Sequence, residues 1–149
     1  MLSIALLPAA VLCGVLLTTQ VGSNSILARA LGNPFASAAV NMTVALVLAV
    51  VILFLAPAPL PDREHPARAP WWAWPAGGAL GIAYLTGNIV LAPRLGAATL
   101  TGLIVIGQLG WSVALDHFGW LGFEQHTAGL SRIAGVALMA AGVLLVVRS

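Results

Sequence analysis

The sequence predicts an all-α integral membrane protein with five transmembrane helices, and three observations lead to this fold class. Hydrophobic residues make up 60% of the 149 residues. Charged residues make up only 7%, whereas soluble domains carry about 25%. Five separate windows also reach the length of about 20 apolar residues that crosses the hydrocarbon core of a bilayer. This composition excludes a soluble enzyme, a disordered chain and a nucleic-acid-binding protein.

The predicted spans leave little chain between them, so we treat residues 1–149 as a single transmembrane domain. The spans cover about residues 2–28, 35–55, 71–91, 96–115 and 129–147.

Helix-breaking residues separate the predicted spans. Asn33 followed by Pro34 is a helix-start signal before the second span. Residues 57–66 contain four prolines and indicate an exposed loop, and residues 93–96 indicate a tight turn. The polar stretch 18–25 interrupts the first span and leaves two interpretations open: a helix broken around a cavity, or the frayed end of a helix.

Basic residues are divided evenly between the two sides of the membrane. With five spans, Arg63, Arg68 and Arg132 lie near one side, and the remaining three arginines lie near the other. Orientation normally follows an excess of Lys and Arg on the cytoplasmic side. The absence of an excess favours a protein that inserts both ways and pairs as an antiparallel dimer. The alternative is that six charges are too few to judge, or that a partner or one dominant loop sets the orientation.

Polar side chains recur at helical spacing within three of the spans. Residues four apart share a helix face, and polar groups in hydrocarbon face a bundle interior or a cavity. We therefore expect a polar cavity that binds a small-molecule substrate, although interhelical hydrogen bonding is the alternative for each single residue. The candidate substrate-binding residues are Gln20, Asn24, Tyr84, Asn88, Gln108, Trp111 and Ser112. Asp116 continues the stripe of the fourth span and is a candidate coupling or gating acid.

Small residues form a bare strip on the fifth span, which has no polar stripe. Gly135, Ala141 and Gly142 would let a second helix approach closely, so we expect a dimer interface there. Packing within one protomer explains the strip equally well. We expect no cofactor and no metal, because the single cysteine and the three histidines show no metal-ligand spacing.

The chain resembles the YdcZ-type bacterial inner-membrane proteins of the drug/metabolite transporter superfamily, over almost its whole length. The segments that carry the resemblance are Gln20–Asn24, Trp74–Gly81, Ala92–Ala98, Gly107–Leu109, Asp116–Gly119 and Leu130–Gly135. The last helix also resembles the dimerising helix of small multidrug resistance exporters. Their first-helix glutamate has no counterpart here, since Gln20 and Asn24 occupy that span.

The resemblance implies one five-helix half of a ten-helix inverted-repeat transporter, acting as an antiparallel homodimer or with a paired homologous chain. We therefore expect a multi-pass protein of the bacterial inner membrane. It would move a small polar metabolite or drug-like molecule by alternating access. Two alternatives remain open: a small dual-topology ion channel and an accessory subunit that transports nothing. An enzyme is not expected, because these residues offer no membrane-embedded nucleophile–base pair.

Overall fold

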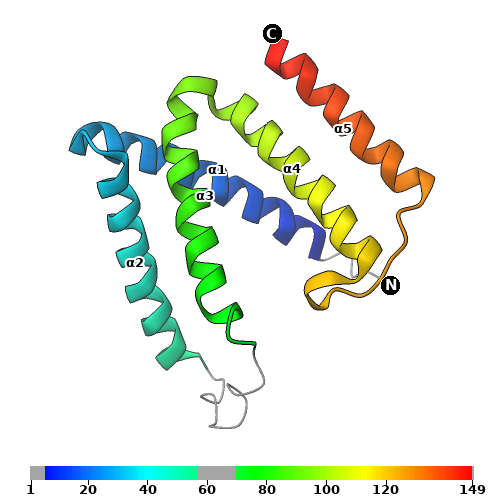
Figure 1. Cartoon of the computed structure of the whole chain (residues 1–149). Coiled ribbons are helices and arrows are strands. Elements are labelled where there is room, and N and C mark those ends of the chain that lie inside the picture. Colours follow the sequence, from blue (N-terminus) through cyan, green and yellow to red (C-terminus); the bar gives the residue numbers. More distant parts are fainter. Residues whose placement is uncertain (1–5, 57–69, 149) are drawn as a thin grey trace. The chain divides into compact units, whose positions relative to one another are not determined.

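The computed structural model describes residues 6–56 and 70–148, and every helix in these residues is of the α type except one short 3-10 turn (Figure 1). The elements are α1 (Leu6–Leu31), α2 (Pro34–Leu55), α3 (Ala73–Leu95), α4 (Ala97–Phe118), η2 (Trp120–Gly122) and α5 (Leu130–Arg148). The five α-helices are each long and apolar enough to cross a membrane. The prediction of an all-α protein with five such helices is thus confirmed. The predicted exposed loop at residues 57–66 lies outside the described residues.

The five helices fall into two compact units. The first contains α1, α2 and α3 and ends at Arg94; the second begins at Leu95 and contains α4, η2 and α5. The single transmembrane domain inferred from the sequence stays a prediction.

Helix α2 begins where the sequence predicted a helix start. The Asn33 side chain caps the helix: its Oδ1 accepts hydrogen bonds from the backbone N–H groups of Phe35 (2.9 Å) and Ala36 (3.3 Å). Pro34 occupies the first helical position, where a missing N–H removes no helical hydrogen bond.

Helix α1 continues through the polar stretch at residues 18–25, so it is neither broken nor frayed there. The hydroxyls of Thr18, Thr19, Ser23 and Ser25 each donate to the carbonyl oxygen four residues earlier. These bonds satisfy each hydroxyl within the helix itself, and they allow Ser and Thr to lie in hydrocarbon without breaking it.

The turn expected at residues 93–96 is also shorter than the sequence predicted. Helix α3 includes Pro93 and ends at Leu95, and only Gly96 separates it from α4. Pro93 lacks the N–H that would donate to the Ile89 carbonyl, and the helix ends two residues later at Leu95. Gly96 has φ +79°, a left-handed conformation that side chains with a Cβ rarely adopt.

Apolar side chains from all three helices of the first unit pack together. Its core consists of Ala38 on α2 with Leu85 and Ile89 on α3, and Ala28 on α1 packs against it. Most large apolar side chains elsewhere on the five helices are exposed. Exposed apolar surface on this scale is expected for helices that face lipid and not water.

In the second unit, α4 and α5 pack side by side (Figure 1). Gly102 of α4 lies directly against Val143 of α5, so closely that a Cβ at position 102 would stand 2.9 Å from Val143 Cγ2. The expected dimer residues Gly135, Ala141 and Gly142 are exposed on α5. A Cβ at Gly135 or Gly142 would meet nothing within 4 Å.

Candidate functional site

A group of buried polar side chains occupies the interface between α1 and α2. Asn24 is 5% exposed, and its Oδ1 accepts a hydrogen bond from Asn41 Nδ2 at 3.1 Å. The Ser37 hydroxyl is fully buried and donates to the backbone oxygen of Asn24 at 2.9 Å. Both bonds connect α1 to α2, and they join residues that are 13 and 17 positions apart in the sequence. They fix the lateral position of the Asn24 amide.

The Asn24–Asn41 pair leaves one donor and one acceptor unused. Asn24 Nδ2 and Asn41 Oδ1 are both buried and have no hydrogen-bond partner in the described structure. A buried amide group without a partner costs about 1–3 kcal/mol. The pair can therefore offer a donor and an acceptor to a polar molecule that enters beside it.

A third amide lies in the same unit on α3. Asn88 is 3% exposed, next to the core residue Ile89. Its side chain forms no hydrogen bond with any other described residue. Two of the candidate residues, Asn24 and Asn88, are thus buried in the interior of the three-helix unit, as polar groups in hydrocarbon should be.

The other two candidates of this unit lie outside its interior. Gln20 is exposed on α1, and Tyr84 is 41% exposed on α3. A spacing of four residues places side chains on one face within about 40°, and that difference is enough to place one at the interface and the other at its edge. Each of the polar stripes on α1 and α3 therefore places one residue in the interior, Asn24 and Asn88 respectively.

On α4, the candidates Gln108, Trp111 and Ser112 are exposed in the second unit. Trp111 belongs to an aromatic cluster at the end of this helix. Its ring centroid lies 6.4 Å from that of Trp120, which stacks on Phe118 at 4.7 Å. The three rings are exposed, so they form an apolar patch at the C-terminal end of α4.

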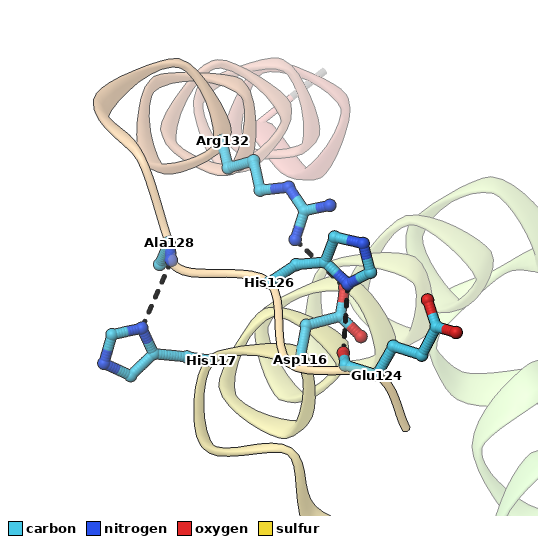
Figure 2. A network of polar contacts seen from close by, with 6 residues as sticks. All are labelled: Asp116, His117, Glu124, His126, Ala128 and Arg132. Carbon is cyan, nitrogen blue, oxygen red and sulfur yellow. Dashed lines mark hydrogen bonds and ion pairs between the residues drawn. The ribbon is translucent and has the colours of Figure 1, made fainter. Parts of the chain in front are cut away.

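Asp116 lies at the C-terminal end of α4 within a network of polar contacts (Figure 2). Its Oδ2 accepts from Arg132 Nη1 of α5 at 3.0 Å, and both side chains are partly exposed, at 30% and 42%. The backbone N–H of His126 donates to the Asp116 carbonyl at 2.8 Å. His117 Nδ1 accepts from the backbone N–H of Ala128 at 3.2 Å.

This network attaches the connection between α4 and α5 to the end of α4. Gln125 Nε2 also donates to the His117 carbonyl at 3.0 Å, and Gly119 ends α4 in the left-handed conformation that allows the chain to turn back. The Asp116 carboxylate is consequently held at the end of a helix, paired across to α5, and still accessible.

Three site residues were not among the candidates from the sequence. The sequence signal for Asn41 is an amide within the most apolar of the five helices. The sequence gives no sign that Ser37 is a site residue, because a serine that faces the interior and one that faces lipid look the same in the sequence. Arg132 pairs with Asp116 because the chain turns back between α4 and α5 and brings together residues 16 positions apart. The spacing of residues along one helix does not predict such a contact.

Comparison with known proteins identifies the family of the chain. A family model described as "Putative inner membrane exporter, YdcZ" matches residues 5–145. No curated protein and no solved structure matches the chain. The family description is that of a membrane transporter, and the five membrane-length helices make the chain a multi-pass protein of the inner membrane. The match covers nearly the whole chain, and the protein therefore belongs to the YdcZ family of inner membrane exporters.

Proposed function

We propose that this protein transports a small polar metabolite or drug-like molecule by alternating access, as an antiparallel dimer. The observation that supports it best is the set of buried amides in the first unit. Asn24 and Asn41 retain an unused donor and an unused acceptor. Asn88 is buried without a hydrogen bond to a described residue. Amides that served only to hold helices together would be expected to satisfy each other fully.

The substrate that fits these groups is uncharged or zwitterionic. The buried residues described in the first unit carry amides, two hydroxyls and aliphatic side chains, and none of those groups is ionisable. A substrate with a net charge would need a counter-charge in so apolar a surrounding. Within the first unit, the amides of Asn24 and Asn88 would donate to and accept from the substrate, and Tyr84 would flank it. Gln108 and Trp111 of the second unit stay candidates from the sequence.

Asp116 is the candidate for coupling or gating in this scheme. Its ion pair with Arg132 is partly solvated, so its formation or loss changes the free energy of the protein by only about 0–1 kcal/mol. A pair of that strength can open and close during a transport cycle. The substitution Asp116→Asn removes the charge and keeps the size.

The antiparallel dimer is supported by the even distribution of the arginines and by the open faces of the helices. Two oppositely oriented five-helix chains would reproduce the inverted repeats on which alternating access relies. The bare strip of Gly135, Ala141 and Gly142 on α5 is available for a second copy.

The substrate site is tested by ligand-dependent thermal stabilisation of the purified protein. The screen uses neutral and zwitterionic metabolites, because a ligand raises the melting temperature only when it binds the folded state. We expect Asn88→Ala and Gln108→Ala to weaken the response to a hit by about tenfold, the effect of losing a hydrogen bond of about 1.4 kcal/mol. Thr43→Ala is the matched control, since the Thr43 hydroxyl is exposed on α2 and bonds to Ala39 of its own helix.

An unchanged response in both amide variants would refute the site. Transport of the hit into proteoliposomes then distinguishes a carrier, which exchanges substrates, from a channel, which conducts far faster and exchanges none. A preparation that is inactive alone and co-purifies with a different chain would indicate an accessory subunit instead.

Dual orientation is tested with a reporter fused to the C-terminus. We expect signal from both sides of the membrane, and we expect one added arginine in the connection between α4 and α5 to shift the ratio. A reporter that responds on one side only would rule out the antiparallel homodimer.

A further inference from the structure

A cavity in the first unit is lined by residues of α1, α2 and α3. It has a volume of about 360 Å³ and opens where α1 and α3 end. Ala28 and Arg29 line it from α1, Ile89, Pro93 and Arg94 from α3, and Pro34 from the start of α2. Residues of the last turn of two helices thus form one hollow, and each of the two helices contributes an arginine.

The two arginines are exposed. Neither Arg29 nor Arg94 forms an ion pair or a hydrogen bond with another described residue, whereas Arg132 is paired with Asp116. No acidic residue lines the cavity in the part of the chain that the structure describes. Two guanidinium groups beside one cavity repel each other. An anion between them would remove that repulsion and would accept hydrogen bonds from several guanidinium N–H groups at once.

The remaining lining indicates what kind of anion fits. Apart from Ser25, whose hydroxyl donates to Val21 of its own helix, the rest of the lining is apolar and includes Ala28, Pro34, Ile89 and Pro93. The cavity thus provides a hydrophobic wall next to the two charges. Because α1 and α3 have the length of membrane-crossing helices, their ends lie at the level of the lipid headgroups. Phosphate groups are abundant at this depth and match the bidentate geometry of arginine.

We propose that Arg29 and Arg94 form a binding site for a phosphate group, with the apolar wall contacting the organic part of the same molecule. This inference goes beyond the transport proposal and does not depend on it. The phosphate comes from the headgroup of an anionic phospholipid or from a soluble phosphate, and both use the same two guanidinium groups.

A different role for the arginines would be purely structural. Cations in the last turn of a helix stabilise it by compensating the partial negative charge of the C-terminal carbonyls. Removal of either arginine would then lower the melting temperature whether or not phosphate is present. The decisive quantity is therefore the ligand-dependent change in melting temperature, and not the melting temperature itself.

The experiment uses the full-length protein, delipidated in a neutral detergent. Three probes are titrated: phosphatidylglycerol, phosphatidylcholine with the same acyl chains, and inorganic phosphate. The variants are Arg29→Gln and Arg94→Gln. The control Arg148→Gln removes one charge from the last turn of α5, outside the cavity.

We expect phosphatidylglycerol to stabilise the unmodified protein more than phosphatidylcholine does. Each cavity variant should bind it about tenfold more weakly, as expected for loss of a charge-assisted hydrogen bond, while Arg148→Gln binds it normally. Stabilisation by inorganic phosphate that requires both arginines would support the same site with a soluble ligand.

The proposal is overturned if Arg29→Gln and Arg94→Gln respond to all three probes as Arg148→Gln does. Should a glutamine variant fail to fold, Arg29→Lys and Arg94→Lys keep the charge and lose the bidentate geometry. These lysine variants should then bind phosphatidylglycerol with an affinity below that of the unmodified protein, and an unchanged affinity in both would also overturn the proposal.

Discussion

The contact between Gly102 and Val143 leads to a quantitative prediction about the packing of α4 on α5. In Gly102→Ala, the new methyl group would stand 2.9 Å from Val143 Cγ2 and 3.0 Å from Val143 Cγ1. Separations this short require a shift of the helices or of the valine. Valine is stiff about its first side-chain dihedral, so it cannot easily turn away.

Two opposing effects set the size of the loss. Overpacking of a tight contact costs about 1–3 kcal/mol, whereas replacing glycine by alanine within a helix gains about 1 kcal/mol. The net destabilisation is therefore on the order of 1 kcal/mol, or about 2–4 °C in melting temperature. Val143→Ala removes both close atoms and leaves Val143 Cβ at 3.5 Å, an ordinary contact. In the double variant we therefore expect a coupling energy of about 1–3 kcal/mol.

The assay is thermal denaturation of the four members of this cycle in one detergent. Gly110→Ala is the matched control, because it lies on the same helix and its Cβ would meet nothing within 4 Å; it should be neutral or slightly stabilising. The reasoning is refuted if Gly102→Ala melts at or above Gly110→Ala, or if Val143→Ala does not relieve the loss.

Three further predictions concern single contacts. Asn33→Ala removes both cap bonds of α2 and should lower the unfolding free energy by about 1 kcal/mol, measured by thermal denaturation. Asp116→Asn should change the melting temperature little, since its exposed pair with Arg132 contributes about 0–1 kcal/mol, yet it should abolish substrate transport in proteoliposomes; normal transport would exclude a coupling role. Asn41→Leu should destabilise by about 1–3 kcal/mol because it leaves Asn24 Oδ1 buried without a donor, whereas the double variant Asn24→Leu/Asn41→Leu should recover stability and still lose substrate binding.

The sequence alone was sufficient for the five helices and for the start of α2. The length of an apolar segment is a local property of the sequence. A helix in lipid must also satisfy its backbone hydrogen bonds within itself. Each span can therefore be predicted as a helix without knowing which helices pack beside it. The Asn33 cap is local for the same reason, because its bonds reach only two and three residues ahead. The family segments likewise pointed to a membrane transporter.

Only the tertiary structure decided which polar residues enter the interior. Gln20 and Asn24 share a stripe, yet Asn24 is buried and Gln20 is exposed. The partner of Asn24, the close approach of Gly102 to Val143, and the pairing of Asp116 with Arg132 all join separate helices. Lipid supplies no hydrophobic drive between helices, so helix contacts depend on the fit of particular surfaces, which the spacing of residues along one helix does not specify.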